Sequence, residues 1–154
     1  MNNELSPGQA LSRLQRLCSR AEKCIADVRK KLQDWNVPAS EIPAIITKLQ
    51  AQGFLDEARY AKAFVRDKNR LSHWGTVKIK QALLSKKIPA ALVAEALQEI
   101  DREQYKTDLS RLLQRKAATL TAASPADRHA RLLRFALGRG YEYDVAYEEM
   151  KKIR

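Results

Sequence analysis

Apolar residues along this chain recur at the three- and four-residue steps of an α-helix. Val28 and Leu32 lie one helical turn apart, and after a short break the steps resume at Ile42, Ile46 and Leu49. Such spacing places each set on one face of a helix. No segment alternates apolar and polar residues for long enough to predict a strand, so the pattern indicates an all-α fold.

The same apolar pattern occurs three times. The first copy consists of Val28, Leu32, Val37, Pro38, Ile42, Ile46 and Leu49. A shift of 51 positions matches it to Ile79, Leu83, Ile88, Pro89, Val93, Leu97 and Ile100, and a further shift of 53 leads to the weaker set Leu132, Ala136, Tyr141, Ala146, Met150 and Ile153. Self-similarity at this period predicts tandem structural repeats. We expect Leu32 and Leu83, and likewise Val37 and Ile88, to occupy equivalent places.

Each copy is predicted to hold three helices. Turn signals interrupt the apolar pattern at residues 35–40, 86–90 and 138–142, and a further helix precedes each pair at about residues 7–18, 56–71 and 102–118. A unit this small buries little surface alone, so we expect the units to stack into an elongated, curved array of right or left hand. The expected boundaries are 1–52, 53–100 and 101–154.

The helix predicted over residues 56–71 separates cations from apolar side chains. At about 100° per residue, Arg59, Lys62, Arg66 and Arg70 share one stripe, whereas Tyr60, Phe64 and Leu71 fall toward the other side. We therefore expect the aromatic residues in the core and the cations on the surface. Across this unit, burial is predicted for Phe64, Ile79, Leu83 and Leu97.

Positive charge is spread along the whole chain. The net charge of the 154 residues is +11, and the three expected units carry +3, +4 and +4 in order. An even surplus favours an extended cationic surface over a basic tail, and such a surface suits nucleic acid or an acidic protein.

Enzymatic and metal-binding signatures are missing from the sequence. It contains no GxxxxGK[ST], GxSxG or HExxH motif and no paired CxxC. Cys18 and Cys24 stand six apart without a nearby His, which favours reduced, partly buried thiols over a metal site. We expect no cofactor and no catalysis.

The N-terminal residues lack a leader pattern and no long apolar run occurs, so we expect a cytoplasmic protein without a membrane partner.

The segment of residues 53–88, GFLDEARYAKAFVRDKNRLSHWGTVKIKQALLSKKI, resembles the RecX family of bacterial recombinase regulators. The similar positions are Gly53, Phe54, Leu55, Asp56, Glu57, Arg59, Tyr60, Ala61, Gly75, Lys78, Ile79, Leu83 and Ile88. The chain departs from the family pattern at Glu57, where Asp is usual, at Lys78, where Arg is common, and at Lys87, which replaces a turn glycine. Asp56 also has a structural explanation, because it can cap the helix that follows.

The resemblance implies a regulator, mainly an inhibitor, of the RecA recombinase in homologous recombination, DNA repair and the SOS response. Members of the family are expected to lie in the groove of a RecA filament on single-stranded DNA. There they bridge subunits and reduce ATP hydrolysis, strand exchange and co-protease activity. We expect this chain to act as a monomer with that filament as its partner, with direct DNA contact left open.

Residues 62–87 hold eight cations against the single acid Asp67, so ion pairs within the helix cannot neutralise them. A second cluster of cations falls in the third unit, where arginine offers a planar fork for phosphate or carboxylate. The predicted binding residues are Arg59, Lys62, Arg66, Arg70, Lys78, Lys80, Lys86, Lys87, Arg111, Arg115, Arg128 and Arg131. Two alternatives remain: a helical DNA-binding module that acts without RecA, and a scaffold whose basic face meets an acidic protein.

Overall fold

The computed structural model describes residues 4–154, and within that range it consists of nine α-helices and one short 3₁₀ turn, without strands. The all-α prediction is confirmed. The helices are α1 (Pro7–Arg20), α2 (Ile25–Asp34), α3 (Ile42–Ala51), α4 (Glu57–Arg70), α5 (Thr76–Ser85), α6 (Ala90–Leu97), α7 (Arg102–Thr119), α8 (Pro125–Gly138) and α9 (Tyr143–Met150), with the turn η1 (Ala39–Glu41) before α3. None of the described helices is long and apolar enough to cross a lipid bilayer.

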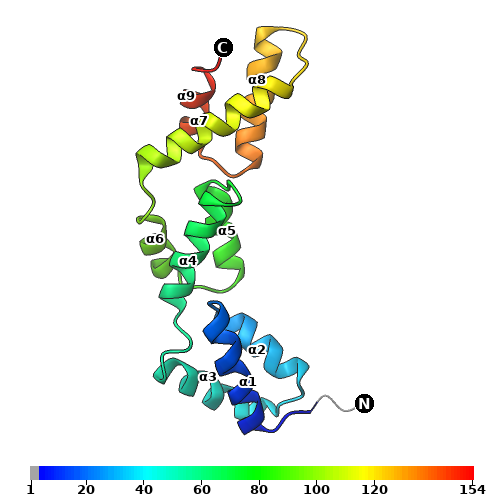
Figure 1. Ribbon diagram of the computed structural model, residues 1–154, viewed down its shortest axis with the longest axis vertical. Helices are drawn as coiled ribbons and strands as arrows, with labels where there is room; N and C mark the ends of the chain where they lie inside the picture. Colours follow the sequence, from blue (N-terminus) through cyan, green and yellow to red (C-terminus); the bar gives the residue numbers. More distant parts are fainter. Residues whose placement is uncertain (1–3) are drawn as a thin grey trace.

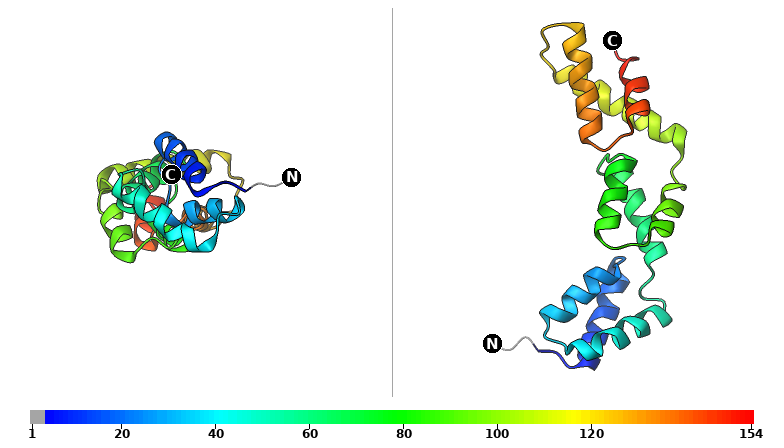
Figure 2. Two further views of the ribbon diagram at one scale, coloured as in Figure 1. Left: turned by 90° about the horizontal axis from the view of Figure 1, so that it is seen from below. Right: turned by 180° about the vertical axis from the view of Figure 1, so that it is seen from behind.

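The helices form three groups of three that follow one another along the long axis of the molecule (Figure 1). We call α1–α3, α4–α6 and α7–α9 the first, second and third repeat. The body is elongated and gently curved, and α2, α5 and α8 lie along one side of it in both the front and the back view (Figure 2). The predicted tandem array is therefore confirmed.

The same helix-ending turn occurs in every repeat. Asn36, Lys87 and Gly140 all adopt positive φ angles, of 56°, 62° and 92°. In each case the next residue donates its backbone N–H to a carbonyl five positions earlier, in the pairs Val37 to Leu32, Ile88 to Leu83 and Tyr141 to Ala136. This left-handed ending closes α2, α5 and α8 alike. It confirms the expected equivalence of Leu32 with Leu83 and of Val37 with Ile88, and it shows that Lys87 adopts the conformation that glycine favours.

Polar side chains begin the first helix of each repeat. Ser6 accepts the Gln9 N–H and forms a reciprocal capping box with the Gln9 side chain. Asp56 accepts the Arg59 N–H at 3.0 Å, and Asp101 caps α7 in the same manner. The capping role expected of Asp56 is confirmed. Each of these side chains satisfies a backbone donor that the helix itself leaves free.

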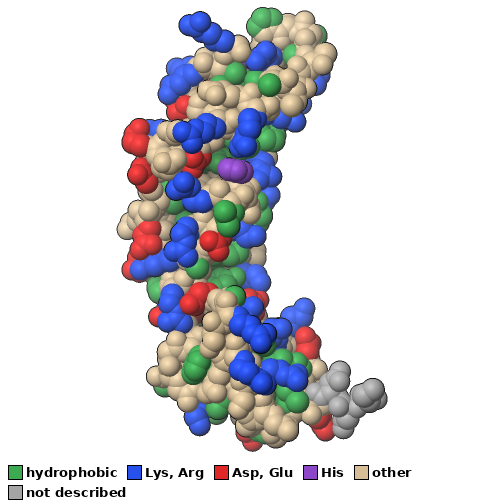
Figure 3. All heavy atoms as spheres, viewed as in Figure 1, with side chains coloured by type: hydrophobic (Ala, Val, Ile, Leu, Met, Phe, Trp, Pro, Cys, Tyr) green, Lys and Arg blue, Asp and Glu red, His purple; other side chains and the backbone are tan. Residues whose placement is uncertain are grey.

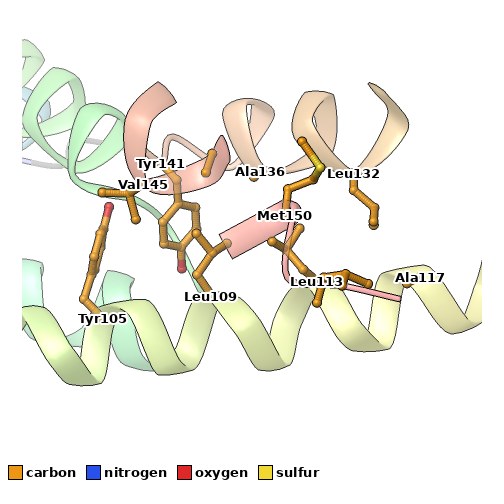
Figure 4. Close-up of a cluster of buried hydrophobic side chains, with 11 residues drawn as sticks. Tyr105, Leu109, Leu113, Ala117, Leu132, Ala136, Tyr141, Val145 and Met150 are labelled. Carbon is orange, nitrogen blue, oxygen red and sulfur yellow. The ribbon is translucent and has the colours of Figure 1, made fainter. Parts of the chain in front are cut away.

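Each repeat has its own apolar core. In the third repeat, α7 contributes Leu109 and Leu113, which point toward α8 and α9 across a cluster that also holds Tyr141 and Met150 (Figure 4). In the second repeat Ile79 and Leu83 are fully buried, as predicted. Phe64 and Leu97 are only partly buried at the edge of that core, so the prediction that they are buried is wrong for these two.

Leu71 lies outside the core and is 76% exposed, although the helical wheel places it on the same side as Tyr60 and Phe64. The buried positions of α4 move around the helix, from Tyr60 and Ala61 near its start to Val65 and then Asn69 near its end. Leu71 lies about 20° from Tyr60 on the helical wheel, but at this end of α4 that side of the helix no longer faces the core. Asn69 is buried instead, and its side chain donates to the Trp74 carbonyl at 2.9 Å.

The second and third repeats meet through backbone hydrogen bonds. The N–H of Gly75 donates to the Arg139 carbonyl at 2.8 Å, and that of Val77 donates to the Gly140 carbonyl at 2.9 Å. A Cβ atom at Gly75 would lie 2.3 Å from backbone atoms of Gly140 and Tyr141. The two chain segments thus approach as closely as glycine permits, which explains the glycine at this position.

A buried tyrosine completes that junction. The Tyr105 hydroxyl accepts the Thr76 N–H at 3.0 Å and donates to a Glu142 carboxylate oxygen, while Arg102 donates to the other oxygen at 2.7 Å. Burial opposes ionisation of Glu142, but the bonds from Tyr105 and Arg102 outweigh it and lower the pKa of this carboxyl group. Glu142 is therefore a fixed anion that joins α7 to the start of α9.

The first and second repeats meet through one buried thiol and several polar contacts. Cys24, at the N-cap position of α2, is fully buried in the core of the second repeat. The Ile25 N–H donates to a Glu57 carboxylate oxygen at 3.1 Å. Both cysteines are free, and they are buried more deeply than the partial burial expected from the sequence. Burial raises their thiol pKa values.

Candidate binding surface

Three of the four predicted cations on α4 are paired with acids from other helices or loops. Arg59 contacts Glu22 at 2.6 Å, and Arg70 contacts Asp108 on α7 at 3.3 Å. Lys62 lies between Glu95 and Glu99, at 3.8 and 3.4 Å. Arg66 reaches only its neighbour Asp67, at 3.8 Å with both side chains well exposed, a geometry that contributes little binding energy.

These pairs revise the charge argument made from the sequence. Acids within residues 62–87 cannot neutralise the local cations, but acids of the first repeat, of α6 and of α7 do so for several of them. Lys86 donates to Asp27 of α2 at 2.8 Å, and this bond raises the pKa of Lys86. Arg59 and Lys86 thus tie the second repeat to the first.

Lys78 packs on an aromatic ring. Its ammonium nitrogen lies 4.4 Å from the centre of the Trp74 ring, and that of Lys68 lies 4.8 Å from the same ring. Trp74 itself packs against the core of the second repeat. Lys78 therefore has a local structural role through a cation–π contact, which leaves it less available to an external anion.

In the third repeat, two of the predicted arginines on α8 have local partners. Arg131 contacts Asp127 at 3.1 Å within the helix, and Arg128 donates to the carbonyl of Arg154 at 2.9 Å. Arg139, from the turn after α8, donates to the carbonyls of Ser72 and His73 and so braces the junction with the second repeat. These contacts favour structural roles for Arg128 and Arg139.

Four of the predicted binding residues are exposed cations that form no ion pair within the described part of the chain. Lys80 lies on α5 and Lys87 in the turn after it, whereas Arg111 and Arg115 lie one turn apart on α7. Their charge is available to a ligand without first breaking an internal pair, which is the requirement for a strong electrostatic contribution to binding.

Arg111 and Arg115 border an open hollow of about 590 Å³ at the junction of the second and third repeats. His73, Asp108, Gln114 and Ala118 line the rest of it. Asp108 is held by Arg70 and by the Gln104 side chain, which donates to it at 2.7 Å, and only 12% of its side chain is exposed. Its negative charge is thereby largely neutralised, so the hollow favours an anion.

Cations of α4 and α7 line two hollows at the junction, which the Arg70–Asp108 pair connects. Arg66 and Arg70 line a narrow groove that reaches Gln104 and Tyr105 of α7, and Arg70 reaches the hollow through Asp108. We name Arg66, Arg70, His73, Arg111 and Arg115 the junction surface. In Figure 3, Lys and Arg side chains spread over α4 and α7 on the visible face, while acids gather toward the edge formed by α6.

The sequence identified the cations but not the ion pairs that make some of them unavailable to a ligand. Glu22, Glu95, Glu99 and Asp108 lie more than thirty positions from the cations that they pair with, so no local pattern connects them. The sequence offered one signal of the close contact between the second and third repeats, namely the glycines Gly75 and Gly140 at the turns where these repeats meet.

The chain has clear relatives among known proteins. The family model for the second three-helix domain of RecX matches residues 56–97. The regulatory protein RecX of Leptothrix cholodnii is 34% identical over 128 residues, which cover 82% of this chain and 77% of that protein. The chain belongs to the RecX family. Another RecX protein, from Thermus thermophilus, is 32% identical over 140 residues, 91% of this chain and 89% of its own length. The chain spans 59% of a RecX protein of Clostridium botulinum, to which it is 33% identical.

Solved RecX structures share the fold. A crystal structure of regulatory protein RecX matches with a TM-score of 0.79 and 24% identity, covering 95% of this chain and 71% of the other. RecX from Lactobacillus salivarius matches with a TM-score of 0.79 and 19% identity over 96% of both chains. The resemblance that the sequence indicated is therefore confirmed at the level of family and fold.

Proposed function

We propose that this chain binds the RecA filament on single-stranded DNA and inhibits its ATP hydrolysis, strand exchange and co-protease activity. Membership of the RecX family carries the proposal, and the unpaired cations of an elongated body support it. The three units, residues 1–52, 53–100 and 101–154, bind along the filament together as one monomer in the cytoplasm. Regulation is by binding and needs neither catalysis nor a cofactor.

The junction surface is the proposed centre of contact. It combines Arg111 and Arg115, which form no ion pair among residues 4–154, with Arg66, whose one ion pair within that range is weak. An arginine fork matches the planar oxygen pairs of carboxylate and phosphate. Lys80 on α5 and Lys87 in the turn after it add further positive charge. Helix α5 itself lies on the side of the body that α2 and α8 share (Figures 1 and 2). Arg59, Lys62, Lys78, Lys86, Arg128 and Arg131 contribute mainly by holding the array in shape.

A second candidate is DNA binding without RecA. The hollow bordered by Arg111 and Arg115 favours it, since its cations suit phosphates as well as protein carboxylates. The two functions differ in one measurable respect. A filament regulator binds RecA on single-stranded DNA far more tightly than it binds either component, whereas a DNA-binding module binds free DNA with a steep salt dependence and ignores RecA.

The test compares charge reversal at two places. We expect Arg111→Glu with Arg115→Glu to weaken binding to the filament at least about tenfold, a loss of about 1.4 kcal/mol. Both side chains are exposed, so the free energy of unfolding should stay within about 0.5 kcal/mol of that of the wild type. Affinity is measured by fluorescence anisotropy on labelled oligonucleotide with RecA, on the oligonucleotide alone and on RecA alone.

The matched control reverses Arg16 and Lys48 to Glu in the first repeat. Both residues are exposed and form no ion pair among the described residues, and the net charge changes by the same amount. The control should retain most of the affinity. Equal losses in both variants would mean that overall charge, not the junction surface, governs binding. Full affinity in the Arg111 and Arg115 variant would remove this surface from the account.

A further inference from the structure

The outer face of α9 differs from the rest of this cationic protein. Residues Tyr143–Met150 contain three carboxylates and no Lys or Arg. Val145 and Met150 point inward to the core of the third repeat (Figure 4), and Ala146 is buried in the same core, whereas Tyr143 and Tyr147 are exposed. Their side chains are 60% and 42% exposed, whereas Tyr60, Tyr105 and Tyr141 are all buried. Two exposed aromatic rings thus stand on the most acidic helix of the chain.

The two exposed rings form an ordered pair. Their centres are 6.1 Å apart and their planes differ by only 11°. Asp144 directly follows Tyr143, and Glu148 directly follows Tyr147. Both acids are exposed, so a row of carboxylates runs beside the row of rings. We name Tyr143, Asp144, Tyr147 and Glu148 the α9 face.

A cation already occupies one end of the α9 face. The Lys151 ammonium nitrogen lies 5.5 Å from the centre of the Tyr147 ring and 3.1 Å from a Glu148 carboxylate oxygen. Both partners of this ion pair are about half exposed, and exposed pairs of this kind contribute little stability. The position therefore attracts a positive charge, and the lysine that fills it is readily displaced.

We propose that the α9 face is a docking site for an arginine-bearing segment of a protein partner. Lys151 reaches the Tyr147 ring and one Glu148 oxygen with a single ammonium group. A guanidinium group can instead lie flat on an aromatic ring and donate two parallel bonds to a carboxylate, which lysine cannot do. Tyrosine and arginine are also the residues that most often dominate protein interfaces. Asp144 and Glu148 also border a cavity of about 700 Å³ that Lys106, Arg111 and Lys152 line. On the side of the two rings these carboxylates repel phosphate, which disfavours nucleic acid as the occupant there. This docking site is additional to the proposed function, and it does not require that the chain bind RecA.

The test is an NMR titration of the full chain with hexa-arginine, hexa-lysine and an oligodeoxythymidylate. We expect hexa-arginine to shift the ring resonances of Tyr143 and Tyr147, with an affinity about two- to fivefold above that of hexa-lysine, the factor that an exposed cation–π contact supplies. The oligonucleotide should leave both rings unshifted. Shifts caused by the oligonucleotide in place of the peptide would show nucleobase stacking and overturn the proposal.

Three variants separate docking from general charge attraction. Tyr143→Leu with Tyr147→Leu should abolish the preference for arginine over lysine, and Lys151→Ala should strengthen hexa-arginine binding by freeing the site. Asp144→Asn with Glu148→Gln should weaken it, whereas Asp34→Asn with Glu41→Gln, two exposed acids in the first repeat, should not. Equal weakening in both neutralised variants, or an unchanged preference for arginine after removal of the rings, would overturn the proposal.

Discussion

Replacing Gly75 with Ala should unfold or separate the second and third repeats more than any surface change in the chain. The added Cβ would lie 2.3 Å from backbone atoms of Gly140 and Tyr141, which cannot move aside as the end of a side chain can. The bonds from Gly75 to Arg139 and from Val77 to Gly140 would lengthen or break. Overpacking together with two weakened hydrogen bonds gives a loss of roughly 2–6 kcal/mol.

Urea unfolding measures the loss, and small-angle scattering reports whether the body keeps its length. Gly138→Ala is the matched control, since a Cβ at that last residue of α8 meets nothing within 4 Å. Alanine also favours the helical conformation over glycine, so the control should be as stable as the wild type or slightly more stable. If Gly75→Ala unfolds at the midpoint of the wild type, the close junction described for the second and third repeats does not exist in solution.

Leu83→Ala should lower the free energy of unfolding by about 2–5 kcal/mol, as large-to-small changes in a packed core do. Leu83 is fully buried, and its carbonyl accepts the bond that closes the turn after α5. Truncation would leave a cavity between α5 and the helices packed on it. The neighbouring Leu84 is 42% exposed, so Leu84→Ala is the control and should cost far less. Equal midpoints for the two variants would contradict the repeat alignment.

The repeat architecture was predictable because it rests on local signals that recur. The apolar steps define the helices, and the turns after α2, α5 and α8 share one backbone conformation whether Asn36, Lys87 or Gly140 occupies the position. Leu71 shows the limit of that reasoning. A helical wheel assumes one buried stripe, but α4 meets different neighbours at its two ends, and its buried side rotates along its length.

The proposed binding surface was predictable only as a set of cations. Whether a cation is available depends on acids that the fold brings to it, and those acids are far away in sequence. Lys62 and Arg111 look alike in the sequence, yet Lys62 lies between two glutamates while Arg111 has no ion pair among the described residues. The structure thus shifts the proposed centre of contact from the α4 stripe toward α7.

The rate of RecA-dependent ATP hydrolysis on single-stranded DNA, measured with increasing amounts of this protein, tests the central claim most directly. The account predicts that the rate falls as the protein saturates the filament. The Arg111→Glu, Arg115→Glu variant should need at least about tenfold more protein for the same inhibition, in line with its loss of binding. An unchanged rate at concentrations where anisotropy shows the filament to be saturated would contradict the claim that this chain inhibits RecA.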